Sequence, residues 1–200
     1  MKKQILITIG REYGSGGHDL AALLSQRLGI RMLDRELIDE LWKNDPEMQQ
    51  LAQQYDERPA NRILSRKINE FDNSIPHNVA QRQFDMIRQI ADSGESAIFV
   101  GRCADYILRD HPRTVNIFIA AGRAERIERL CRLHGIAPGE AESLMDRTDA
   151  RRAAYYNYYS SGTWGMAETY DLCIDSSVLG IDGTTGFVLE FVERKLGVKP

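Results

Sequence analysis

The sequence predicts an α/β fold in which a five-stranded parallel sheet carries helices on both faces. Several short runs, of which residues 5–9 are the first, are apolar, rich in β-branched residues and free of polar alternation. Such runs are typical of strands buried on both faces of a parallel sheet. Longer segments with apolar residues at helical spacing lie between them. Because this alternation is typical of parallel sheets covered by helices, we expect one three-layer domain over residues 1–200.

The first strand leads into a helix through a glycine-rich turn. Over residues 18–28, Leu20, Leu24 and Leu28 recur at helical spacing, and Gly29 then provides the residue that a helix C-terminal cap prefers. The other expected strands are residues 30–33, 97–100, 114–120 and 172–174. Segments with a helical pattern alternate with these strands. They begin after residue 34 and continue over residues 80–91, 127–134, 147–152 and 187–192.

Residues 44–78 interrupt this alternation. They are polar and contain Pro46, Pro59 and Pro76. Proline removes a backbone donor and breaks regular structure. We therefore expect a mobile or loosely packed insertion here rather than part of the sheet.

The composition limits the kinds of partner. With 200 residues, 42% of them hydrophobic, the chain has the size of one ordinary domain. Its formal net charge of -3 argues against a surface that coats nucleic acid, because such surfaces neutralise many phosphates with Lys and Arg. The apolar run at residues 5–9 is too short for a secretory signal, and no segment has the length of a membrane span. We expect a soluble, cytoplasmic protein without nucleic-acid or membrane partners.

The three cysteines, Cys103, Cys131 and Cys173, lie far apart in the chain. They form no CxxC pair and have no histidine nearby at the spacing of zinc ligands. We expect reduced, mostly buried thiols and no metal site built from them.

The turn after the first strand reads Gly14-Ser15-Gly16-Gly17. Between a buried strand and an amphipathic helix, backbone N–H groups and the helix N-terminus together bind phosphate. Glycine suits such a turn because a Cβ would block the approach of the backbone to the anion. A tight turn without a ligand is the alternative. The position in the first strand–helix unit favours phosphate binding.

This turn lacks two functional residues of the common phosphate-binding motif GxxxxGK[ST]. Aligned with that motif, Gly17 stands at the position of the lysine, His18 at the position of the Ser or Thr, and Arg11 at the first glycine. The lysine normally reaches the terminal phosphates, and the hydroxyl holds magnesium. Arg11 is the cation that we expect to replace the lysine.

Residues 9–17, Ile-Gly-Arg-Glu-Tyr-Gly-Ser-Gly-Gly, resemble the altered phosphate loop of the cytidylate kinase-like family. Gly101 and Arg102, after a strand, are similar to the Gly-Arg pair of cytidylate kinases, whose arginine holds the phosphate of the accepting monophosphate. Residues 146–152 resemble the lid segment of these kinases, in which spaced arginines close over the transferring phosphoryl group. Residues 171–176 resemble their last strand.

The resemblance covers nearly the whole chain, and residues 153–168 match as poorly as residues 44–78. It implies a P-loop NTPase-like fold and a phosphotransferase that moves the γ-phosphoryl group of ATP to CMP, dCMP or a similar small acceptor. Residues 44–78 would include the acceptor-binding region, and residues 138–168 would form a lid-like region. Magnesium is expected together with ATP, without a protein ligand that the sequence identifies.

The resemblance also implies a set of site residues. The nucleotide-binding residues would be Gly10, Gly14, Ser15, Gly16, Gly17 and His18. Asp34, which falls where these kinases begin their acceptor-binding stretch, and Arg102 would bind the acceptor. The catalytic residues would be Arg11, Arg147 and Arg152.

Three departures from the family pattern fall on parts that carry chemistry. Besides the missing lysine and the missing Ser or Thr, Val100 replaces an acidic residue just before the Gly-Arg pair. The arginines of residues 147–152 also fit a solvated helix face paired with Asp146 and Asp149. The alternative to a kinase is therefore a nucleotide-binding regulatory module of the same fold without turnover.

Half of the eight tyrosines lie within residues 155–159, close to Trp164. Stacking on a nucleotide base is one interpretation. Packing of a lid helix, or of a subunit interface in a homodimer, is the interpretation that we favour, because helical spacing spreads these rings over more than one face.

Overall fold

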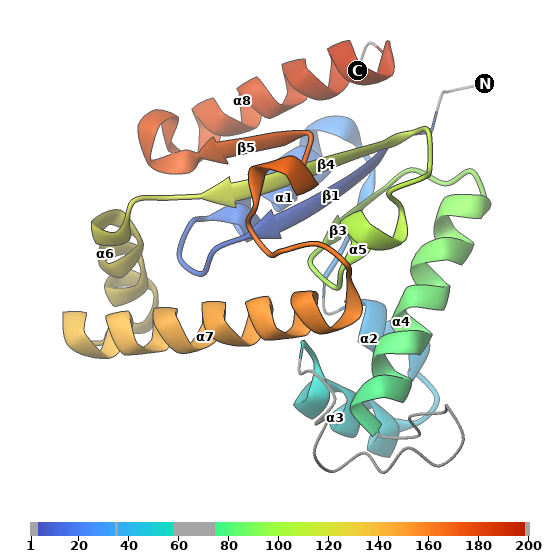
Figure 1. Ribbon diagram of the computed structural model, residues 1–200, viewed down its shortest axis with the longest axis horizontal. Helices are drawn as coiled ribbons and strands as arrows, with labels where there is room; N and C mark the ends of the chain where they lie inside the picture. The colour runs from blue at the N-terminus through green and yellow to red at the C-terminus, as the bar shows by residue number, and fades with distance from the viewer. Residues whose placement is uncertain (1–3, 35, 58–74, 199–200) are drawn as a thin grey trace.

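Figure 1 shows the computed structural model, which describes residues 4–34, 36–57 and 75–198, with the backbone alone for residues 36–38. Five strands form one sheet in the order β2-β3-β1-β4-β5, and every neighbouring pair is parallel. The strands are β1 (Leu6–Arg11), β2 (Arg31–Leu33), β3 (Ala97–Val100), β4 (Thr114–Ala120) and β5 (Leu172–Asp175). The predicted five-stranded parallel sheet is confirmed.

Helices cover both faces of this sheet, so the predicted three-layer fold is also confirmed. One face carries α1 (Gly17–Leu28) and α8 (Ser176–Leu196), and the other carries α4 (Ile75–Asp92) and α5 (Ala104–Ile107). After β4, α6 (Arg123–His134) packs against the long helix α7 (Pro138–Tyr159), which runs alongside the sheet (Figure 1). The remaining helices are α2 (Glu36–Leu41), α3 (Pro46–Tyr55) and a 3-10 turn (Ala167–Thr169).

Alternation along the central strand β1 divides the core into two parts. Ile7 and Ile9 are buried against α1 and α8, whereas Leu6 points to the opposite face and packs with residues of α4 and α5. Successive side chains of a strand point to opposite faces, so an apolar run without alternation supplies both layers at once. The glycine turn, for which the sequence predicts phosphate binding, follows the end of this strand.

The region of residues 44–78 is more regular than the sequence predicts. Pro46 is at the start of α3, where its missing N–H costs nothing, and the Asp45 side chain accepts a hydrogen bond from a backbone N–H of the first turn. Ala52 of this helix is fully buried. The expectation of loose packing is therefore wrong for residues 46–55, while residues 58–74 lie outside the described part of the chain.

The tyrosine-rich end of α7 packs inside the molecule. Tyr155 and Tyr156 are buried, and the Tyr159 ring lies 4.9 Å from the Tyr155 ring and 5.4 Å from that of Phe84 in α4, measured between centroids. This geometry favours the packing interpretation over base stacking, with α4 of the same chain as the partner.

The cysteines differ from the expectation of mostly buried thiols. Cys103 is buried, Cys131 is half-buried and Cys173 is exposed, and all three are free. Across the residues that the structure describes, no helix combines the length and the apolar character needed to cross a membrane.

Candidate functional site

The glycine turn joins the end of β1 to the start of α1. Gly14 and Gly16 have φ angles of 84° and 78°, a left-handed region that glycine adopts without strain. A Cβ at Gly17 would lie 2.6 Å from the Cβ of Arg11, so the turn approaches the strand too closely for any other residue. Because α1 begins without a side-chain cap, its N-terminus and the glycine turn form an arrangement suited to phosphate.

A cavity of about 770 Å³ opens at this turn. It lies beyond the carboxyl ends of the parallel strands, where open α/β sheets bind their ligands. The turn contributes Gly14, Gly16 and Gly17 to its lining. The charged or titratable residues that line it are Arg11, Glu12, His18, Asp19, Asp34, Asp56, Glu57, Arg102, Arg129, His134, Arg151 and Arg152.

A buried ion pair ties the turn to the two helices beyond it. Arg126 of α6 donates from Nε to the carbonyl of Tyr13 at 2.8 Å and pairs with Asp149 of α7. Asp149 in turn accepts a hydrogen bond from the N–H of Tyr13 at 2.8 Å. Glu12 joins the same group, 3.3 Å from the Arg126 guanidinium. The position of the turn therefore depends on α6 and α7, which lie far from it in sequence.

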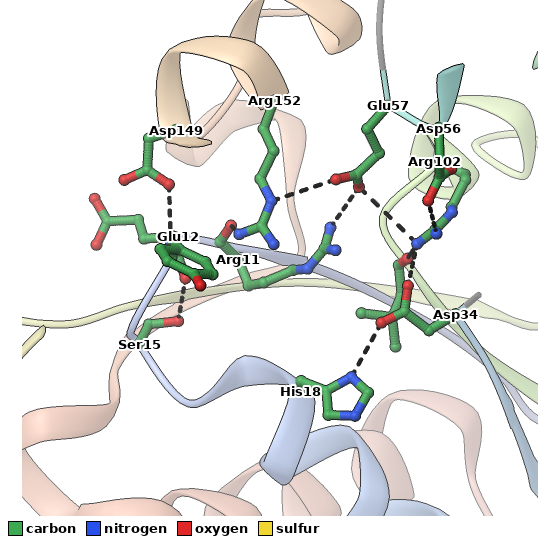
Figure 2. Close-up of polar contacts among 12 residues, drawn as sticks. Arg11, Glu12, Ser15, His18, Asp34, Asp56, Glu57, Arg102, Asp149 and Arg152 are labelled. Carbon is green, nitrogen blue, oxygen red and sulfur yellow. Dashed lines mark hydrogen bonds and ion pairs between the residues drawn. The ribbon is translucent and has the colours of Figure 1, made fainter. Parts of the chain in front are cut away.

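Arg102 lines the cavity with its charge already paired. Because the sequence predicts acceptor binding by Asp34 and Arg102, we call their side of the cavity the predicted acceptor end. Its guanidinium contacts Asp34 and donates to Asp56 at 2.5 Å and to the carbonyl of Val100 at 2.9 Å (Figure 2). Only 2% of the side chain is exposed. Both Arg102 and the following Cys103 have a φ of 53°, which is strained for residues with a Cβ. The fold thus holds this arginine in an unusual backbone conformation.

Glu57 lies among three arginines, in the place that a phosphoryl group would suit. Its carboxylate is 2.9 Å from Arg11, 3.4 Å from Arg152 and 4.0 Å from Arg102. Figure 2 shows the three guanidinium groups turned toward it from different elements. A Cβ at Gly101 would lie 2.2 Å from a guanidinium nitrogen of Arg11, so this glycine leaves the space that the Arg11 side chain needs.

The ionisation of these groups follows from their pairing. Burial alone would raise the pKa of Glu57, but the charges of Arg11, Arg102 and Arg152 lower it to about 2. Burial, followed by the charge of Arg11, lowers the pKa of Arg152 to about 10. Both groups therefore remain charged at neutral pH, and the ion pairs among them persist.

Most of the predicted site residues line one cavity, although they come from four separate segments of the chain. The predicted residues found there are Arg11, Gly14, Gly16, Gly17, His18, Asp34, Arg102 and Arg152. His18 and Asp34 contact each other, with 3.0 Å between His18 Nδ1 and Asp34 Oδ2.

Three predicted residues lie elsewhere. A Cβ at Gly10 would come within 2.8 Å of the Phe118 ring, so Gly10 serves strand packing and does not face the cavity. Ser15 is buried, and its hydroxyl donates to the carbonyl of Glu12 at 2.8 Å, within the turn. Arg147 is exposed on α7 outside the lining, which instead includes Arg151.

Sequence reasoning missed Asp56 and Glu57. Both stand at the end of α3, 46 residues from their partners Arg102 and Arg11. No local motif marks them, and they lie within residues 44–78, where the family resemblance is poor. Only the tertiary fold brings their carboxylates to the arginines.

Magnesium, which the sequence leads us to expect together with ATP, has no preformed cluster of protein ligands in the described part of the chain. Within residues 4–34, 36–57 and 75–198, no group of three His, Cys, Asp or Glu side chains is arranged to hold a metal. The carboxylates of Asp34, Asp56 and Glu57 are paired with arginines.

The five-stranded parallel sheet and the glycine turn after its central strand define a P-loop kinase fold. The chain belongs to the cytidylate kinase-like family, which residues 6–178 match. Among solved structures it is similar to an uncharacterized protein from Eubacterium ventriosum ATCC 27560, with 30% identity and a TM-score of 0.76, covering 95% of this chain and 99% of that one. No curated protein matches at the sequence level.

Two more distant neighbours share the fold. A shikimate kinase from Bacteroides thetaiotaomicron has 12% identity and a TM-score of 0.56, covering 94% of this chain and 98% of its own. The shikimate kinase from Acinetobacter baumannii, in complex with shikimate, has 13% identity and a TM-score of 0.51, covering 96% and 94%. At this identity the likeness concerns the fold alone.

Proposed function

We propose that the protein transfers the γ-phosphoryl group of ATP to a small acceptor, with CMP or dCMP as the acceptors that family membership suggests. One observation carries this proposal: the phosphate-binding turn and three arginines from separate elements surround a single cavity. Phosphoryl transfer proceeds through a transition state with charge spread over three equatorial oxygens. Catalysis therefore depends on positioning and charge neutralisation.

In this proposal each group has a separate task. The phosphates of ATP lie against the backbone of residues 14–17, and Arg11 takes the place of the lysine. Arg152 reaches the transferring group from α7, and the acceptor lies beside Asp34 and Arg102. Phosphate oxygens replace Glu57 as the partners of the arginines, because a phosphate group carries more negative charge and more acceptor oxygens than one carboxylate.

A regulatory module that binds nucleotide without turnover is the second candidate. It is supported by the missing lysine and by the carboxylates that already pair with Arg11 and Arg102. In such a module ATP would displace the Glu57 carboxylate from the arginines, and no phosphoryl group would be transferred.

Two measurements on the purified chain separate these functions. ATP should raise the melting temperature, because the turn exists only in the folded state and binding adds RT ln(1 + [L]/Kd) to stability. With magnesium in the buffer, ADP should then form in the presence of one member of a panel of nucleoside monophosphates and hydroxylated compounds. Stabilisation without turnover would support the module. An unchanged melting temperature at millimolar ATP would contradict both functions.

A further inference from the structure

His18 and Asp34 form an oriented pair inside the cavity. Nδ1 of His18 faces Asp34 Oδ2 at 3.0 Å (Figure 2), while the side chains are 57% and 15% exposed. The second ring nitrogen, Nε2, makes no hydrogen bond to any residue in the described part of the chain. An ionised Asp34 therefore holds the proton of neutral His18 on Nδ1 and leaves Nε2 as a free acceptor.

The charges around the imidazole favour this arrangement. Asp34 faces it from the end of β2, Asp19 from α1 and Arg11 from β1. The hydrogen bond with Asp34 raises the pKa of His18 above its ordinary value, while burial and Arg11 oppose the shift. Burial would raise the pKa of Asp34, but the hydrogen bond from His18 and the charge of Arg102 lower it well below its usual range. Asp34 thus stays ionised over the whole pH range in which His18 titrates.

The predicted acceptor end of the cavity suits a hydroxyl better than a phosphate. Arg102 is the cation nearest to this end, and Asp34, Asp56 and Glu57 all lie within 4.0 Å of it. A phosphate dianion entering beside Arg102 has to displace Asp34 and Asp56, the carboxylates that already pair with this arginine. A hydroxyl group donates a hydrogen bond to the same carboxylates.

We infer that the acceptor attacks through a hydroxyl group and that His18, positioned by Asp34, is the general base that receives its proton. This inference rests on the proposed phosphoryl transfer and replaces a nucleoside monophosphate with a hydroxyl compound as the acceptor. The acceptor O–H bond breaks as the bond from that oxygen to the γ-phosphorus forms, and the proton moves to Nε2. The bond from the γ-phosphorus to the bridging oxygen breaks, and ADP leaves with that electron pair.

The first test compares acceptors that differ only at the attacking oxygen. Cytidine and CMP share a base and a sugar, and they present a 5′-hydroxyl and a 5′-phosphate respectively. The same assay includes polyols, sugar acids and hydroxylated amino acids, with water as the background acceptor. ADP formation should favour hydroxyl compounds or water over every monophosphate. Preferential turnover of a nucleoside monophosphate overturns the hydroxyl assignment and leaves the proposed kinase function intact.

The second test removes the base. For the best acceptor found, or for water, the wild-type kcat should rise with pH through the pKa of His18, since only the neutral ring accepts a proton. In H18Q the rise of kcat with pH should disappear. The kcat of H18Q should also be at least about tenfold lower than that of wild type, a loss at or below the low end of the range for general-base catalysis. Its ATP-induced thermal shift should remain. The control is H111Q, which removes a histidine of the turn before β4 that does not line the cavity.

The third test does not depend on turnover. Nitrogen-15 NMR of the imidazole should show neutral His18 protonated on Nδ1, with a pKa above 6.5 that falls in D34N. A neutral ring protonated on Nε2, or a pKa that D34N leaves unchanged, would overturn the pairing. Equal kcat and equal pH profiles in H18Q and wild type would overturn the base assignment. ATP affinity that weakens as pH rises, and does so only when His18 is present, would assign His18 to phosphate binding instead.

Discussion

At the scale of single residues, Arg11 decides whether this site is catalytic. It is the last residue of β1, just before the glycine turn, and its guanidinium lies 2.9 Å from Glu57 in a buried ion pair. Removal of Arg11 should lower kcat by roughly two orders of magnitude, as for the loss of one preorganised charge-stabilising donor. R11K should recover only part of this loss, because an ammonium group lacks the planar fork of guanidinium.

The fold must be monitored in the same experiment. R11A leaves the buried Glu57 with fewer partners, so the double variant R11A/E57Q serves as a control without that carboxylate charge. Both variants should bind ATP more weakly and turn over slowly while melting cooperatively. Unchanged turnover in R11A would show that Arg11 supports the turn alone, and it would favour the regulatory module.

Glu57 supports a second prediction at this scale. Because its carboxylate occupies the arginines that phosphates would contact, E57Q should bind ATP more tightly, by about tenfold, or ~1.4 kcal/mol. Titration calorimetry would measure the change. The matched control is E40Q, which removes a half-exposed partner of Arg31 outside the cavity. Equal or weaker binding by E57Q would contradict the view that this carboxylate stands where phosphate binds.

At the scale of elements, the contact between α6, α7 and the glycine turn is the feature that should control nucleotide affinity. Asp149 joins all three through Arg126 and the N–H of Tyr13. D149N should weaken ATP binding about tenfold and lower the melting temperature, because it leaves a buried arginine short of its partner. D146N, one turn earlier on α7, loses only exposed contacts with Arg123 and should change little. Equal effects of the two variants on ATP affinity would refute this role.

The contact between α5 and α7 supports a pH-dependent prediction. Tyr156 of α7 donates to the buried Asp105 at 2.6 Å, and burial raises the pKa of Asp105 to about 6. The folded pKa lies above the ordinary value of 3.8, so the stabilising contribution of protonated Asp105 is complete below about pH 3.8 and is lost as pH rises through 6.

D105N keeps an acceptor for the tyrosine hydroxyl and removes the buried charge. Above pH 6 this variant should therefore be more stable than wild type, by at most roughly 3 kcal/mol for a shift of about two pKa units. Near pH 4 the two proteins should melt alike. Urea titrations at pH 4 and pH 8 would measure the difference, and a variant that is less stable at pH 8 would contradict the prediction.

At the scale of the whole molecule, the features that the sequence predicts best are those that depend on short, local stretches of chain. The buried run at residues 5–9 and the glycines after it identify the central strand and the turn, because both depend on short stretches of chain. The prolines of residues 44–78 predict irregular structure, but Pro46 stands at the start of α3 and does not break a helix. Asp56 and Glu57 could not be predicted, because their partners are defined only when the end of α3 packs beside β1 and β3.

The site in which Arg11, Arg102 and Arg152 face Asp34, Asp56 and Glu57 has a consequence for the response to ionic strength. A site of free cations attracts ATP through a field that dissolved salt screens, and its affinity falls steeply as salt is added. Here the phosphates of ATP displace the Glu57 carboxylate, which becomes hydrated when it leaves the arginines. Because the arginines are paired before and after binding, few counter-ions are released. Between 50 and 200 mM salt, the Kd for ATP should change by no more than roughly twofold. In E57Q the same titration should become steeper, because that variant presents unpaired guanidinium charge to the solvent.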